Sequence, residues 1–171
     1  MLKTLRRIHR IGLVTEAAPC EDQAMRVREV LGRRILQIMG RALCVRMVDA
    51  GSCNGCELEI NALSNPIYNI EGLGVRFVAS PRHADLLLVT GPVSIHMRDA
   101  LLRVFEATPD PKLVVAVGDC GCNGGIFGVG GASLGPVSNV IPVDAAVAGC
   151  PPTPTRLLAG ILTALSPSEG R

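Results

Sequence analysis

Three short apolar runs in this chain each end beside a cysteine that has glycine next to it, and this feature constrains the fold most. Apolar runs of five to eight residues are typical of strands that are buried on both faces of a parallel sheet. Such strands all end at the same edge of the sheet, so we expect the cysteines that follow them to lie close together. The three motifs are Asp49-Ala-Gly-Ser-Cys-Asn-Gly-Cys-Glu-Leu-Glu-Ile60 after run 43–48, Gly118-Asp-Cys-Gly-Cys-Asn-Gly-Gly125 after run 113–117, and Gly149-Cys-Pro-Pro152 after run 140–147.

Segments with helical spacing separate these runs from one another. Helices are predicted from about Cys56 to Leu63, over 95–107 and over 151–165, and the Gly-rich stretch 121–138 is predicted to be a loop. Further strands are predicted at 75–79 and 84–90. Strand–helix alternation predicts an α/β fold with a doubly wound, mostly parallel sheet. The scarcity of aromatic residues also argues against an all-β sandwich and against a surface that stacks nucleic-acid bases.

Positive charge is concentrated at the start of the chain. Residues 1–46 contain ten Lys or Arg and four Asp or Glu, whereas the remainder is acidic. Residues 1–22 are predicted to be irregular or weakly helical, and 23–42 to form a basic amphipathic helix that docks on a partner or a membrane surface, or packs on its own domain. We therefore divide the chain into a basic N-terminal arm (1–42), an α/β domain (43–166) and a disordered tail (167–171).

The cysteine count indicates reduced thiols and metal binding. There are seven cysteines, no run of about 18 apolar residues that would span a membrane and no convincing secretory signal. An odd number of cysteines in such a chain argues against disulfides. Two of the seven have simpler interpretations, since Cys44 lies in an apolar strand and Cys20 is expected to be a free thiol in the arm.

Four cysteines are the candidate metal ligands. Thiolates at one sheet edge are the ligand set of an iron–sulfur cluster, while a structural zinc site or a dithiol redox site are the alternatives. Cys122 competes with Cys120 as the third ligand, and Cys120 is preferred because it directly ends its strand. The candidate ligands are Cys53, Cys56, Cys120 and Cys150.

Glycines beside these cysteines are predicted to let the backbone approach a cofactor. A residue without Cβ permits close approach of N–H groups and positive φ angles. Gly124 and Gly125 are predicted to give such access too, and the glycines assigned to cofactor binding are Gly51, Gly55, Gly121 and Gly149. The run 128–133 lacks the lysine of a phosphate-binding loop and is interpreted as ordinary loop.

Between about residues 36 and 163, these motifs resemble the small subunit of [NiFe]-hydrogenases and the homologous 20-kDa-type subunit of respiratory complex I. They are most similar to membrane-bound, energy-converting hydrogenases, including the formate-hydrogenlyase type. The resemblance implies a flavodoxin-like fold and one [4Fe–4S] cluster, with the four candidate cysteines as ligands. It also implies a large catalytic subunit, a ferredoxin-like electron-transfer subunit and membrane subunits as partners, no nucleic acid, and a peripheral position on the cytoplasmic side of a membrane.

The function predicted from this resemblance is electron transfer within a hydrogenase-like oxidoreductase complex, with no catalytic residue on this chain. A complex I-like subunit next to a quinone pocket is the first alternative, and a zinc-stabilised binding module is the remote one. Complex I members carry adjacent cysteines at the first motif, so the spacing between Cys53 and Cys56 favours the hydrogenase branch.

One carboxylate is a candidate proton relay. Glu57 follows Cys56 directly, so its side chain is expected close to the cluster, where it could take up a proton on reduction. The alternative is that Glu57 only favours the helix start or pairs with an arginine of a partner. Glu59 is the internal control because it lies further round the same helix.

Overall fold

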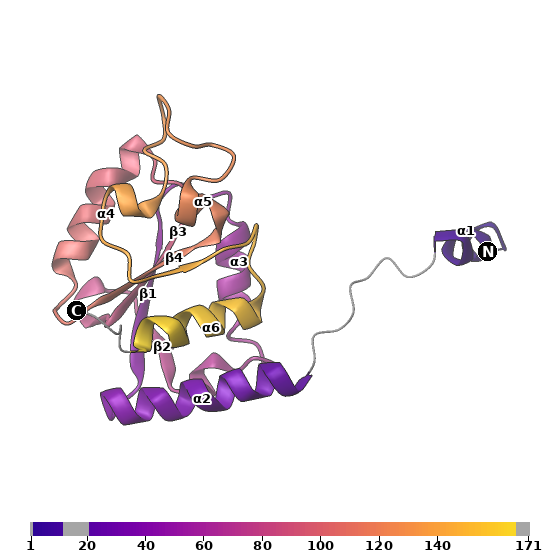
Figure 1. Cartoon of the computed structure of the whole chain (residues 1–171), viewed down its shortest axis with the longest axis horizontal. Coiled ribbons are helices and arrows are strands. Elements are labelled where there is room, and N and C mark those ends of the chain that lie inside the picture. The colour runs from indigo at the N-terminus through magenta and orange to yellow at the C-terminus, as the bar shows by residue number, and fades with distance from the viewer. Residues whose placement is uncertain (1, 12–20, 167–171) are drawn as a thin grey trace.

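Five strands form one sheet in which every neighbouring pair is parallel (Figure 1). The sheet of this computed structural model has the strand order β2-β1-β3-β4-β5, which is the flavodoxin-like order and confirms the predicted α/β fold. It is wholly rather than mostly parallel. The strands are β1 (Leu43–Asp49), β2 (Val75–Phe77), β3 (Leu86–Thr90), β4 (Leu113–Val117) and β5 (Ala145–Val147).

The structure describes residues 2–11 and 21–166. The tail predicted to be disordered (167–171) and the thiol of Cys20 lie outside these residues. The helices are α1 (Leu2–Ile11), α2 (Glu21–Met39), α3 (Gly55–Ala62), α4 (Ile95–Ala107), α5 (Gly118–Asn123) and α6 (Pro154–Leu165), with short 3₁₀ turns at Ile70–Leu73, Pro81–His83 and Val137–Asn139.

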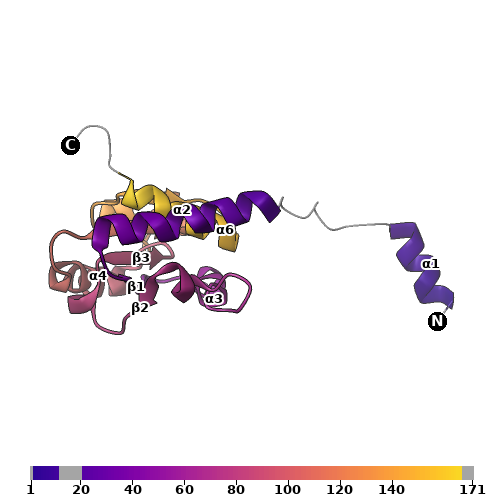
Figure 2. The ribbon, with the colours of Figure 1, turned by 90° about the horizontal axis from the view of Figure 1, so that it is seen from below.

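Helices cover both faces of the sheet, and each face has its own apolar core. Helices α2, α3 and α6 pack on one face, where Figure 2 shows α2 running alongside α6. Helix α4 and the turn at 137–141 pack on the other face. Successive residues of β3 alternate between the two cores, as Leu86 and Leu87 do, so all five of its residues are buried.

Helix α2 is the predicted basic amphipathic helix, and it contributes to the core of the α/β domain. Leu31 and Ile35 are buried against α6 and the sheet, while Met25 and Leu36 on the outer side are 57% and 69% exposed. One side of α2 therefore belongs to the fold, and its outer side remains available for a partner. The domain boundary at residue 42 stays a prediction.

Three segments differ in part from what the sequence predicts. Residues 2–11, predicted to be irregular or weakly helical, form a helix. The predicted loop 121–138 begins inside a helix, because α5 continues to Asn123 and ends at Gly124, whose left-handed backbone (φ +89°) closes its last turn. The segment 140–147, predicted to be a strand or an extended segment, is a strand only at β5, because Ile141 N–H donates to the carbonyl of Val137 and completes a turn there.

Within the described residues, no helix combines the length and the apolar character that crossing a bilayer requires.

Candidate functional site

The four candidate cysteines meet at the carboxyl edge of the sheet, although three separate segments carry them. Cys53 lies in the turn after β1 and Cys56 in the first turn of α3. Cys120 lies in α5, which follows β4, and Cys150 follows β5. Cys53, Cys120 and Cys150 are all near enough to Cys56 to act electrostatically on its thiol. Parallel strands thus bring together residues that are almost one hundred positions apart.

Hydrogen bonds from backbone N–H groups hold the turn that carries Cys53 in place. The carboxylate of Asp49 accepts from the N–H groups of Gly51 and Ser52, both at 2.8 Å. The same turn is joined to the end of β3, since Ala50 N–H donates to the carbonyl of Thr90 at 3.0 Å. The position of Cys53 therefore depends on β3 as well as on its own strand.

A pair of hydrogen bonds joins the segment of Cys120 to that of Cys150. Asp119 N–H donates to the carbonyl of Gly149 at 2.9 Å, and Gly149 N–H donates to the Asp119 carboxylate at 2.7 Å. Position 149 also requires glycine, because its φ is +139° and a Cβ there would lie 2.6 Å from Cα of Pro152. Asp119 and Gly149 thus fix two cysteine-bearing segments relative to each other.

Cys122 points away from the other thiols. Its sulfur donates to the carbonyl of Ala116 at 3.6 Å and packs in the core on the α4 side. Burial, and to a smaller extent the charge of Asp119, raises the pKa of this thiol, and no other cysteine contributes to that shift. Because α5 is helical, residues two positions apart point in nearly opposite directions. The helix therefore directs Cys120, and not Cys122, toward the shared edge.

The predicted glycines differ in what surrounds them. An added Cβ on Gly55 would lie 3.7 Å from the sulfur of Cys53, whereas one on Gly51 would meet Pro92 and Ser94, and one on Gly121 would meet Val89. Gly51 and Gly121 therefore pack against neighbouring segments of the domain and not against the cysteine thiols. Their assignment to cofactor binding stays a prediction.

Gly125, which the sequence predicts to give access, and Gly118, which it does not, lie directly against cysteine sulfurs. A Cβ on Gly118 would come within 2.5 Å of the Cys56 sulfur, and one on Gly125 within 2.7 Å of the Cys120 sulfur. The sequence pattern indicated Gly118 only as a strand end. One sequence signal could have indicated Gly118: a glycine lies one or two residues before the cysteine in both Gly118-Asp-Cys and Gly149-Cys.

Burial and mutual repulsion disfavour the thiolate forms. Burial first, then the negative charges of Glu57, Cys53, Cys120 and Cys150, raise the pKa of Cys56 to about 12. Burial also raises the pKa of Cys120. Both thiols are therefore protonated at neutral pH when no cation is near them, and a cation would have to displace these protons.

Glu57 is buried at this edge, with 4% of its surface exposed. One carboxylate oxygen accepts from the hydroxyl of Ser52 at 2.5 Å and from the hydroxyl of Thr90. The other oxygen is buried without a hydrogen-bond partner among the described residues. Glu59 is half-buried on the same helix. The proton-relay role of Glu57 stays a prediction, and Ser52 and Thr90 are partners that the sequence did not reveal.

Among the described residues, no three His, Cys, Asp or Glu side chains come together as a single metal ion would require. Zinc–sulfur bonds of about 2.3 Å place the sulfurs of a tetrahedral site only about 3.8 Å apart. The cysteines of this edge share a neighbourhood without that tight convergence.

The fold and site define a class of protein: an α/β chain with a flavodoxin-like parallel sheet and four neighbouring cysteines at its carboxyl edge. Residues 53–164 match the family model described as NADH ubiquinone oxidoreductase, 20 Kd subunit. The chain belongs to this family, which confirms the resemblance inferred from its motifs.

Relatives in the family include subunits of hydrogenase and of quinone-reducing complexes. The chain is 46% identical over 141 residues to the probable membrane-bound hydrogenase subunit mbhJ of Pyrococcus furiosus, covering 81% of this chain and 84% of that one. It is 44% identical over 131 residues to formate hydrogenlyase subunit 7 of Escherichia coli, covering 77% of this chain but only 51% of that one. It is 39% identical over 107 residues to an NADH-quinone oxidoreductase subunit of Desulfovibrio desulfuricans, covering 63% and 58%.

Solved structures agree with the fold. A chain in the membrane-bound sulfane sulfur reductase, an archaeal respiratory membrane complex, aligns with a TM-score of 0.64 at 33% identity, covering 73% of this chain and 69% of that one. A chain of an NAD⁺-reducing [NiFe]-hydrogenase aligns with a TM-score of 0.52 at 21% identity, covering 70% and 93%, and supports the fold alone. The chain is thus a member of a family of oxidoreductase-complex subunits.

Proposed function

We propose that this chain is a non-catalytic electron-transfer subunit that holds one [4Fe–4S] cluster in a hydrogenase-type complex. The observation that carries the proposal is the meeting of four thiols from three segments at the carboxyl edge of the sheet. When bound, such a cluster supplies one-electron redox chemistry. The proposed ligands are Cys53, Cys56, Cys120 and Cys150.

The residues at this edge fit a cluster better than a single metal ion. The donor set consists of sulfur alone, which suits iron–sulfur clusters. A cluster brings its own iron and sulfide atoms and needs thiols that surround it without converging on one point. Gly118 and Gly125 leave the sides of two cysteine sulfurs free of Cβ atoms. Gly51, Gly55, Gly121 and Gly149 are proposed to shape the surrounding loops, whose N–H groups would face the anionic group.

The partners and location follow as further parts of the proposal. The chain would dock on a large catalytic subunit and receive or deliver electrons through a ferredoxin-like subunit, with membrane subunits holding the complex on the cytoplasmic side. Relatives named as membrane-bound hydrogenase and formate hydrogenlyase subunits support this assignment. A quinone-reducing complex is the second candidate, favoured by the relatives named as NADH-quinone oxidoreductase subunits. The spacing Cys53-x-x-Cys56 favours the hydrogenase type.

The test is to purify the complex without oxygen and to measure iron, acid-labile sulfide and the EPR spectrum of the reduced protein. We expect about four irons and four sulfides for this chain's site. Replacing any one of the four proposed ligands by Ser should remove or alter its EPR signal. Cys122→Ser and Cys44→Ser are matched controls and should leave the signal unchanged. Loss of the signal in Cys122→Ser with retention in Cys120→Ser would overturn the ligand assignment, and zinc without iron would overturn the function.

A further inference from the structure

A long uncharged segment follows the third cysteine. Residues 120–143 contain no Asp, Glu, Lys or Arg, although charged residues make up 19% of the chain. Within this segment, residues 124–135 form a loop, here called the apolar loop, that projects past α5 at the top of Figure 1. Its large side chains Ile126, Phe127 and Val129 are 94%, 57% and 73% exposed. Such a group of exposed apolar side chains marks an interaction surface.

Hydrogen bonds give the apolar loop a defined shape. Gly128 N–H donates to the carbonyl of Gly124 at 3.0 Å, and Gly130 N–H donates to the carbonyl of Ser133 at 2.8 Å. The Ser133 hydroxyl donates to the carbonyl of Gly128 at 2.9 Å and accepts from Gly135 N–H at 3.1 Å. The exposed side chains are therefore presented on a structured turn, which reduces the conformational entropy lost on binding.

Hydrogen bonds anchor the C-terminal half of the apolar loop to the segment that precedes and begins α4. Leu134 N–H donates to the carbonyl of Val93 at 2.7 Å, and Val93 N–H donates to the carbonyl of Gly135 at 2.9 Å. Ile95 N–H donates to the carbonyl of Ala132 at 3.1 Å, and the Ile95 side chain is itself 46% exposed. The first residue of α4 thereby extends the exposed apolar surface.

The apolar loop is also continuous with the cysteine edge. Gly125 packs directly on Cys120, since an added Cβ would lie within 3.2 Å of the sulfur, Cα and N atoms of that cysteine. Cys53 and Cys150 at the same edge are exposed. A molecule that covers the apolar loop is therefore positioned to cover the thiols as well.

We propose that the apolar loop inserts Ile126 and Phe127 into an uncharged apolar pocket on another protein subunit, the one that covers the cysteine edge. This inference rests on the proposed function only in assuming that the covering subunit belongs to the same oxidoreductase complex. The absence of charged residues from 120–143 favours a pocket on a protein, because charged residues are depleted at the cores of protein–protein interfaces. A lipid surface would favour Lys or Arg beside the apolar side chains, and 120–143 contains neither.

A second copy of the chain is a poorer occupant than a different subunit. Three side chains on a narrow loop cover much less than the roughly 800 Å² per partner that a stable dimer buries. A different subunit reaches that area by covering the loop, Ile95 and the cysteine edge together. The apolar loop then serves as the anchor of a larger interface.

Photo-crosslinking in the intact complex tests the proposal. A benzoylphenylalanine placed at Phe127 should crosslink to one identified subunit, at a segment poor in charged residues. The same probe at Ile67, which is 72% exposed in the turn after α3, is the matched control and should not reach that segment. Crosslinks from position 127 to a second copy of this chain, to lipid or to nothing would each overturn the proposal.

A pair of charge insertions supplies the second measurement. The double variant Ile126→Asp/Phe127→Asp should reduce co-purification of the crosslinked subunit at least tenfold, whereas Ile67→Asp should reduce it less than twofold. The thermal midpoint and the iron content per chain are measured on the same samples. Full co-purification of the double variant would overturn the proposal even where iron is present. Absence of iron from the wild type, with the crosslink intact, would overturn the proposed function and leave the docking inference standing. If the double variant fails to fold, the crosslink from position 127 decides.

Discussion

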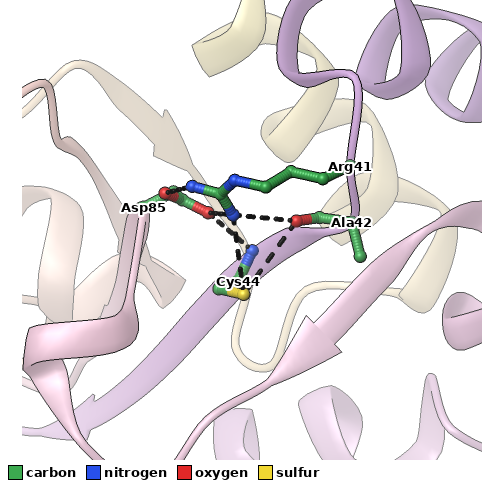
Figure 3. Close-up of polar contacts among 4 residues, drawn as sticks. All are labelled: Arg41, Ala42, Cys44 and Asp85. Carbon is green, nitrogen blue, oxygen red and sulfur yellow. Dashed lines mark hydrogen bonds and ion pairs between the residues drawn. The ribbon is translucent and has the colours of Figure 1, made fainter.

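Cysteines lie at both edges of the same parallel sheet, and their surroundings are opposite. At the amino edge, Cys44 sits beside an ion pair in which the Arg41 guanidinium donates two hydrogen bonds, of 2.9 and 2.7 Å, to Asp85 (Figure 3). Cys44 N–H donates to the same carboxylate at 2.9 Å, and its thiol donates to the carbonyl of Ala42 at 3.9 Å. The polar groups of this edge satisfy one another.

At the carboxyl edge, thiolates would repel one another, and the charged groups that act on Cys56 and Cys120 are all negative. Neighbouring thiolates add to the effect of burial in raising the pKa of Cys56 and of Cys120. Folding alone gives no reason to gather four such groups. The iron atoms of the proposed cluster would supply positive charge at the carboxyl edge, whereas at the amino edge Asp85 is already paired with Arg41.

The size of a hollow does not identify the site. A groove of about 850 Å³ opens at the amino edge, lined in part by Arg41, Cys44 and Asp85. It lies at the opposite end of the strands from the four neighbouring thiols. The chemistry of the side chains, and not the volume beside them, distinguishes the two edges.

The largest expected effect is on thiol reactivity at the carboxyl edge. With a pKa of about 12, Cys56 is ionised to about one part in ten thousand at pH 8, against about one part in ten for a thiol of pKa 9. Iodoacetamide should therefore alkylate Cys56 in the iron-free chain at least about thirtyfold more slowly than it alkylates an ordinary small thiol, because the greater nucleophilicity of a thiolate with a higher pKa offsets only part of the lower ionisation. Peptide mass spectrometry over time measures this rate, which should rise as the pH is raised toward 12.

Glu57→Gln sharpens the same measurement. It removes the second cause of the raised pKa and leaves burial, the first cause, in place. The alkylation rate of Cys56 should rise in this variant but stay well below that of the small thiol. If wild-type Cys56 were alkylated as fast as the small thiol, the conclusion that burial and neighbouring charges raise its pKa would be wrong.

A second prediction compares glycines at the two edges. Gly149→Ala should lower the free energy of unfolding by at least about 2 kcal/mol, because it adds a backbone clash to an unfavourable φ. Gly40→Ala, near the amino edge, has φ +60° and nothing within 4 Å of the added Cβ, so it should cost only about 1 kcal/mol. Urea denaturation of the two variants measures the difference. Equal costs would contradict the tighter construction of the carboxyl edge.

The smallest expected effects separate hydrogen bonding from charge. Asp119→Ala leaves the N–H of Gly149 without its acceptor and should cost about 1–3 kcal/mol. Asp119→Asn keeps an acceptor oxygen and should cost less than about 1 kcal/mol. At the amino edge the carboxylate charge is paired with Arg41, so Asp85→Asn should cost more than Asp119→Asn. Urea denaturation decides, and the reverse order would show that Asp119 acts through its charge.

Much of the fold could be predicted because its signals are local. Continuous apolar runs indicated the buried parallel strands, and helical spacing placed the helix at 95–107 correctly. Errors arose where hydrogen bonding between neighbouring turns overrode composition, as at Gly118–Asn123, which is helical despite its glycines. Parallel strands end at one edge, so the gathering of the cysteine-bearing segments also followed from the sequence.

Tertiary structure alone decided how the side chains at that edge are used. Glu57 is hydrogen-bonded to Thr90, which lies 33 positions along the chain, and Asp119 is hydrogen-bonded to Gly149, which lies 30 positions along. Spacing in the sequence contains no information on such pairs, because they depend on the register between strands. The sequence by itself determined the sheet and which edge carries the thiols. Packing determined that Cys120 joins the other thiols while Cys122 enters the core, since the direction of a side chain depends on the helix that carries it.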